Sequence, residues 1–130
     1  MPHTHRLLCT VLFAIALAGC GIKIRPDQET MARADFGPYP AAYEQTITAF
    51  MQRRLRDPDS ARYRFVGNPL QYFYGVGGEP YYGWRVCAWI NAKNGYGGYT
   101  GEQLAFFLLR DGRVAKSVHT QWAADTLCEG

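Results

Sequence analysis

The clearest alternation of apolar and polar positions in the chain covers residues 41–56. Apolar side chains recur at the spacing of one helical face, at Tyr43, Ile47, Phe50, Met51 and Leu55. This spacing predicts an amphipathic helix with one face in the core and the other in solvent. Pro40 suits the first turn, and the helix must end near Asp57, because the residue before a proline is pushed out of the helical region. Residues 57–60 are expected to form a turn.

After residue 60 the period changes to two, which is typical of strands. Strand patterns cover residues 61–65, 82–91 and 102–110, followed by 113–119, and 70–74 is a further short candidate. Asp111-Gly112 fits a tight type I′ turn and predicts a hairpin around it. We therefore expect an α+β fold, with one amphipathic helix packed on an antiparallel sheet of about four strands. The tail from Gln121 to Cys128 is a candidate helical turn.

A second apolar run lies ahead of this domain. Residues 7–18 are almost unbroken apolar sequence behind a basic start, and the run ends in Leu17-Ala18-Gly19-Cys20. It is short for a membrane-spanning helix and has the layout of an export signal. Leu-Ala-Gly-Cys resembles the bacterial lipobox. The resemblance implies cleavage before Cys20, acylation of Cys20 and stable attachment to a membrane. An ordinary secretory signal is the alternative.

The chain then divides into three parts. Residues 1–19 are the expected signal peptide, 20–40 a lipidated amino terminus and tether, and 41–130 one globular domain. Packing of residues 36–39 on the domain is the alternative to a free tether. Gly21 stands where an Asp would mark retention in the inner membrane, so the resemblance implies the outer membrane, facing the periplasm.

Two cysteines, Cys87 and Cys128, remain in the mature domain. In an oxidising compartment two thiols usually pair, and closing a loop of about 40 residues contributes roughly 3 to 4 kcal/mol. Two buried free thiols or a metal site are the alternatives. His119 is the only mature histidine and no Cys-x-x-Cys spacing exists, so we expect no metal and no cofactor.

The net charge of the mature chain does not indicate the class of its partner. Removal of residues 1–19 takes Arg6 and leaves a formal net charge of +2, and an exported location argues against nucleic acid. Five arginines crowd the end of the helix and the first strand: Arg53, Arg54, Arg56, Arg62 and Arg64. We favour interaction with the helix end and with Asp57 and Asp59 over a basic patch for anionic headgroups or an acidic partner.

The glycine-rich segment 94–101 resembles a phosphate loop only superficially, because it joins two strand patterns and leads into no helix. A plain strand connection with positive φ at its glycines is one interpretation. Alternatively, Tyr96 and Tyr99, with Trp89 or Tyr81 nearby, form an exposed aromatic surface for a partner, with Arg53 and Arg54 as further candidate contacts.

Catalytic candidates are few. Ser117 and His119 share a strand face, yet no acid to orient the imidazole is apparent, and we expect no enzyme. Residues 57–64 and 91–101 resemble segments of small exported bacterial proteins of unassigned function. That resemblance covers most of residues 41–116 and implies a shared helix-plus-sheet domain without supplying an activity.

The sequence thus favours a non-catalytic, lipid-anchored envelope protein that binds another component of the cell envelope. An inhibitor lipoprotein that inserts residues 92–101 into a hydrolase such as lysozyme is the first alternative. A small hydrolase is the second.

Overall fold

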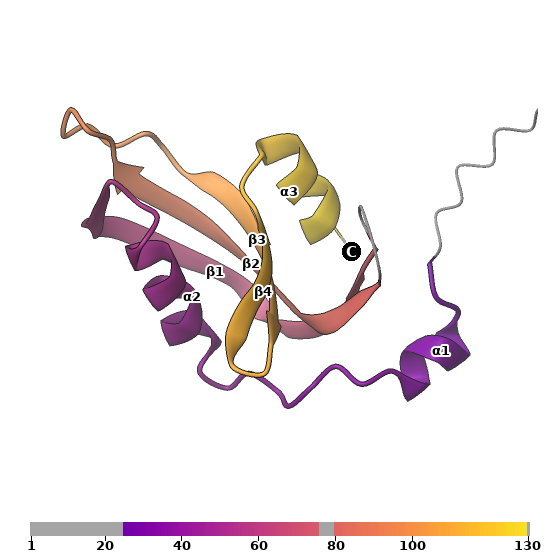
Figure 1. Cartoon of the computed structure of the whole chain (residues 1–130). Helices are drawn as coiled ribbons and strands as arrows, with labels where there is room; N and C mark the ends of the chain where they lie inside the picture. The colour runs from indigo at the N-terminus through magenta and orange to yellow at the C-terminus, as the bar shows by residue number, and fades with distance from the viewer. Residues whose placement is uncertain (1–24, 76–79, 130) are drawn as a thin grey trace, which may run out of the picture.

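The computed structural model describes residues 25–75 and 80–129. Its elements are α1 (Gln28–Arg33), α2 (Tyr43–Gln52), β1 (Asp57–Tyr74), β2 (Tyr81–Lys93), β3 (Gln103–Arg110), β4 (Arg113–Val118) and α3 (Gln121–Cys128). The four strands form one antiparallel sheet in the order β1-β2-β3-β4, with α2 and α3 on opposite faces (Figure 1). The predicted α+β class is confirmed. Within the described residues, none of the helices combines the length and apolarity needed to cross a membrane.

Helix α2 covers one face of the sheet, which we call the α2 face. Its buried residues Ile47 and Met51 pack on Val86, Ala88 and Ile90 of β2 and on the neighbouring part of β3. The helix is shorter than the predicted 41–56. Its end is closed by the Met51 carbonyl oxygen, which accepts from the backbone N–H groups of both residues 54 and 55. The chain turns there, and Leu55 packs back against the core.

Helix α3 covers the opposite face, which we call the α3 face. Its buried residue Ala124 packs against Leu104, Phe106 and Leu108 of β3. The predicted disulfide is confirmed: the Cys87 and Cys128 sulfurs are 1.98 Å apart and join the centre of β2 to the end of α3. Because β3 has a helix on each side, residues 104–109 are buried without interruption.

The strand predictions hold with one correction at β1. The expected strands 61–65 and 70–74 are one long strand, and residues 57–60, expected as a turn, are extended and begin it. Irregular register separates Asp57 from Arg62 and Val66 from Leu70, with φ +66° at Gly67. The bulge lets one strand follow the twisting sheet. Positive φ at Asp111 and Gly112 confirms the predicted hairpin turn.

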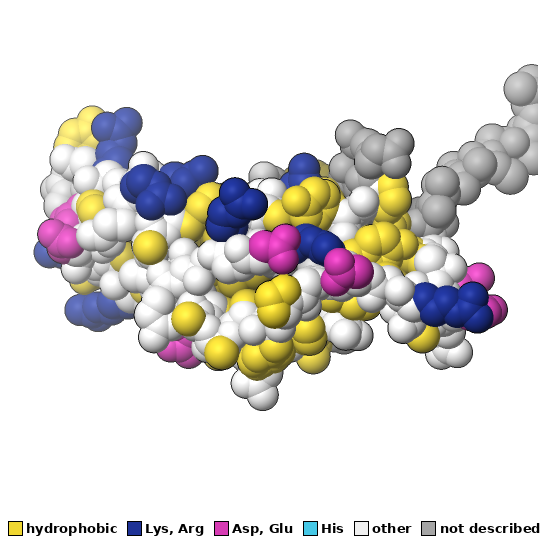
Figure 2. Space-filling model, turned by 60° about the horizontal axis from the view of Figure 1, so that its bottom comes forward, with side chains coloured by type: hydrophobic (Ala, Val, Ile, Leu, Met, Phe, Trp, Pro, Cys, Tyr) yellow, Lys and Arg dark blue, Asp and Glu magenta, His cyan; other side chains and the backbone are white. Residues whose placement is uncertain are grey.

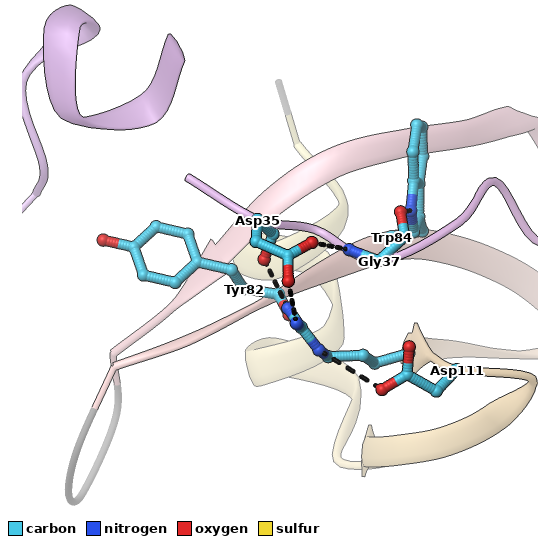
Figure 3. A network of polar contacts seen from close by, with 6 residues as sticks. Asp35, Gly37, Tyr82, Trp84 and Asp111 are labelled. Carbon is cyan, nitrogen blue, oxygen red and sulfur yellow. Dashed lines mark hydrogen bonds and ion pairs between the residues drawn. The ribbon is translucent and has the colours of Figure 1, made fainter. Parts of the chain in front are cut away.

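Residues 35–39 lie against the sheet. Phe36 is buried, and the Trp84 indole N–H donates to the Gly37 carbonyl oxygen at 3.0 Å. Arg110 donates to the Asp35 backbone carbonyl and pairs with the Asp35 carboxylate at 2.8 Å (Figure 3). The Gly37 N–H and the Arg110 guanidinium together hold the pKa of Asp35 below its usual value. The chain is therefore fastened to the domain six residues ahead of the predicted helix.

Candidate partner-binding surface

The loop between β2 and β3 projects beyond the end of the sheet (Figure 1). The Asn94 side chain organises it, since its carbonyl oxygen accepts from the backbone N–H groups of Tyr96 at 2.9 Å and Gly98 at 3.2 Å. The Asn94 N–H donates in turn to the Gly98 carbonyl oxygen at 2.8 Å. Gly97 has φ +81°, a conformation that glycine adopts without strain. The loop backbone is thus held by its own hydrogen bonds.

The two tyrosines of this loop have different surroundings. Tyr96 is 99% exposed, whereas Tyr99 is 39% exposed. The Tyr99 hydroxyl donates to the Ser60 carbonyl oxygen at 3.1 Å, and its backbone forms an isolated bridge with Lys93. Tyr99 therefore fastens the loop to β1, and Tyr96 is left as its free aromatic ring.

Cations lie over the aromatic rings beside the loop. The Arg62 guanidinium is 4.8 Å from the centre of the Tyr99 ring, and that of Arg64 is 5.4 Å from the Trp89 ring. Arg64 also donates twice to the Glu102 carboxylate, at 3.2 and 3.0 Å, which lowers the pKa of Glu102. We call this group, together with Tyr96, the loop surface. It lies on the α3 side of the sheet, opposite Tyr63 and Phe65.

The predicted site residues do not all meet there. Tyr96, Tyr99 and Trp89 gather at the loop surface, but Arg53 and Arg54 lie at the end of α2, which covers the other face. The Arg54 guanidinium lies 3.5 Å from the Phe50 ring centre and donates to the Phe50 carbonyl oxygen at 3.3 Å. This contact is the expected interaction of a basic residue with a helix end.

The expected pairing of the arginines with Asp57 and Asp59 is absent from the part of the chain that the structure describes. Asp59 instead accepts from the Gln52 side-chain amide at 3.1 Å. Glu102, which the sequence did not reveal as a partner, pairs with Arg64. Strand alternation places Arg62 and Arg64 on one face, but the register that pairs Arg64 with Trp89 is set by long-range contacts that a single sequence does not display.

His119 is packed edge-on against Phe107, with ring centres 5.6 Å apart. Burial and the nearby positive charge of Arg54 lower its pKa. In the described residues no hydrogen bond joins it to Ser117 or to a carboxylate. Over the same ranges, no three His, Cys, Asp or Glu side chains gather as a metal site would require. Within residues 25–75 and 80–129, no acid is placed to orient the imidazole.

Comparison of the chain with protein-family models, with curated proteins and with solved structures finds no match.

Proposed function

We propose that this is a non-catalytic, lipid-anchored envelope protein that binds another component of the cell envelope through the loop surface. The observation that carries the proposal is Tyr96, whose ring is almost fully exposed on a loop with an internally bonded backbone. A large exposed aromatic ring on an ordered loop is typical of a contact residue, because little conformational entropy is lost when it meets a partner.

The charges around the loop favour a partner with acidic or polar groups. Arg62 and Lys93 both lie over the Tyr99 ring, at 4.8 and 5.6 Å, and neither forms an ion pair in the described residues. Glu102 neutralises Arg64 alone. A partner that brings carboxylates to this side of the loop would meet two cations while its apolar side chains cover Tyr96.

The membrane anchor is part of the proposal and rests on the lipobox-like motif. Cys20 lies outside the described residues. Attachment to the outer membrane, facing the periplasm, is what the motif and Gly21 imply. Metabolic labelling with a fatty-acid analogue tests it: Cys20→Ala should carry no label and should leave the membrane fraction. Undiminished labelling of that variant would rule out this anchor.

Crosslinking in intact cells, followed by identification of the captured protein, tests the binding role. Tyr96→Ala should lose the captured partner, and Tyr39→Ala is the matched control, since Tyr39 is also an exposed aromatic residue but packs on Trp84 at the other end of β2. Equal capture by both variants would contradict the assigned surface.

The projection of the loop also supports the second candidate, an inhibitor of a hydrolase such as lysozyme. In that case the captured protein is the hydrolase, and addition of the protein should stop its reaction. Capture without any effect on an enzymatic reaction would favour a structural envelope partner.

A further inference from the structure

A cavity of about 310 Å³ opens on the α2 face, between the end of α2 and the sheet. Its lining is mainly apolar and includes Met51, Leu55, Ile90 and Ala105. We call it the α2 pocket. Its volume is at the lower end of the range for small-molecule sites. It touches the end of the glycine-rich segment only at Thr100 and is distinct from the loop surface.

Two basic side chains, Arg54 and His119, complete the lining of the α2 pocket. Both rest on aromatic rings that contact one another: Arg54 lies over Phe50, His119 packs on Phe107, and the two phenyl rings are 6.2 Å apart. Among the residues that the structure describes, no Asp or Glu lines the pocket. Basic side chains therefore lie at the mouth of an apolar cavity, and no described carboxylate in its lining neutralises them.

A groove of about 440 Å³ adjoins it, because Arg54 also lines this second hollow. Arg53, directly after α2, and Arg113 of β4 also line it, and none of the described residues in the lining is acidic. None of the three arginines forms an ion pair within residues 25–75 and 80–129. Lys and Arg side chains gather along the upper margin of the face in Figure 2, with most Asp and Glu side chains lower or to the side. Arg113 joins the two helix arginines only through the folding of β4 against α2, so the sequence did not reveal this cluster.

We propose that the α2 pocket and its basic groove bind one molecule of a small anionic amphiphile, a carboxylate or phosphate ester with a short apolar chain. The chain occupies the α2 pocket, where burial of methylene groups is favourable. The anionic head lies at Arg54, flanked by Arg53 and Arg113, because guanidinium groups donate paired hydrogen bonds to carboxylate and phosphate oxygens. This ligand is independent of the macromolecular partner, which meets the other side of the sheet.

Titration of the full-length protein with decyl phosphate, kept below the concentration at which it forms micelles, tests the proposal. Saturable binding of one molecule is expected. Inorganic phosphate lacks the chain and decyl glucoside lacks the charge, so each should bind at least tenfold more weakly. Absence of saturable binding, or equal binding of the neutral glucoside, would overturn the proposal.

Variants locate the site. Arg54→Gln should weaken decyl phosphate binding tenfold or more, while Arg33→Gln, which removes the same charge from the distant helix α1, should leave it unchanged. Gln103→Trp fills the pocket from an exposed position without changing charge, so it tests the site even if Arg54→Gln does not fold. Unchanged binding in Gln103→Trp, or equal loss in Arg33→Gln, would contradict the assignment.

Two further measurements identify the residues that contact the head group and show whether the ligand is a bilayer lipid or a free amphiphile. The His119 resonance, assigned by its loss in His119→Gln, should report a raised pKa when decyl phosphate binds, because an anion favours the charged imidazole. No change in that pKa would place the head elsewhere and contradict the proposal. Displacement of decyl phosphate by phosphatidylglycerol vesicles would assign the ligand to bilayer lipid, and failure to displace it would assign it to a free amphiphile; both support the anionic site.

Discussion

On the α2 face a helix of ten residues buries two large side chains, Ile47 and Met51, in the core of the sheet. On the α3 face a helix of eight residues buries only Ala124 and ends at a disulfide. The first helix is held by apolar volume and the second by a covalent bond. The comparison teaches that a short helix with little to bury stays on a sheet when a crosslink limits its freedom in the unfolded chain.

The difference extends to what each face leaves open. Because α3 is short, Val66 and Leu70 on β1 remain about half exposed, and Arg64 covers Trp89 in place of a helix. The α2 face is closed by larger side chains, and its hollows include the α2 pocket and the basic groove, which share Arg54. The two faces therefore expose different features: the α3 face presents the aromatic rings and cations of the loop surface, and the α2 face presents a mainly apolar pocket beside three arginines.

Removal of the disulfide should have the largest effect. The double replacement Cys87→Ser and Cys128→Ser should lower the free energy of unfolding by about 4 kcal/mol, since the bridge spans 41 residues. Hydrogen exchange should show α3 amides losing protection first, with α2 amides still protected. Equal loss of amide protection in both helices would contradict this difference between the two faces, because it would mean that packing holds α3.

Replacement of Ile47 by Ala should remove about 3 kcal/mol, because the side chain is fully buried and leaves a cavity in the α2-face core. Urea unfolding followed by tryptophan fluorescence measures this loss. Here both helices should unfold together. Gln45→Ala, an exposed change on the same helix, is the control and should shift stability by less than about 0.5 kcal/mol. A similar small shift for Ile47→Ala would contradict the account of this face.

Acidification should lower the free energy of unfolding by a smaller amount, through His119 on the α2 face. The pKa of His119 is lowered in the folded chain, so the fold favours the neutral imidazole. That contribution is complete above the unfolded pKa of about 6.5 and is lost as the pH falls through the folded value. The melting temperature should be lower at about pH 5.5 than at about pH 7.5, and His119→Gln should reduce this difference. An unchanged pH dependence in that variant would exclude His119 as its source.

Much of this fold could be predicted because local patterns specify it. The 3.6-residue spacing placed Ile47 and Met51 in the core, and Asp111-Gly112 marked the hairpin turn. The patterns at 61–65 and 70–74 were expected to be two strands, but the structure joins them in β1 through irregular register between Val66 and Leu70. The candidate site was harder to predict, because strand pairing and helix docking decide which arginines are neighbours.

The central claim is that Tyr96 is a contact residue and Tyr99 a structural one, and one pair of measurements on Tyr96→Ala tests it most directly. Partner capture and thermal unfolding are measured on the same preparation. The account predicts that capture weakens by at least about 2 kcal/mol while the melting temperature stays the same, because the ring is 99% exposed. Unchanged capture, or a large fall in melting temperature, would contradict it.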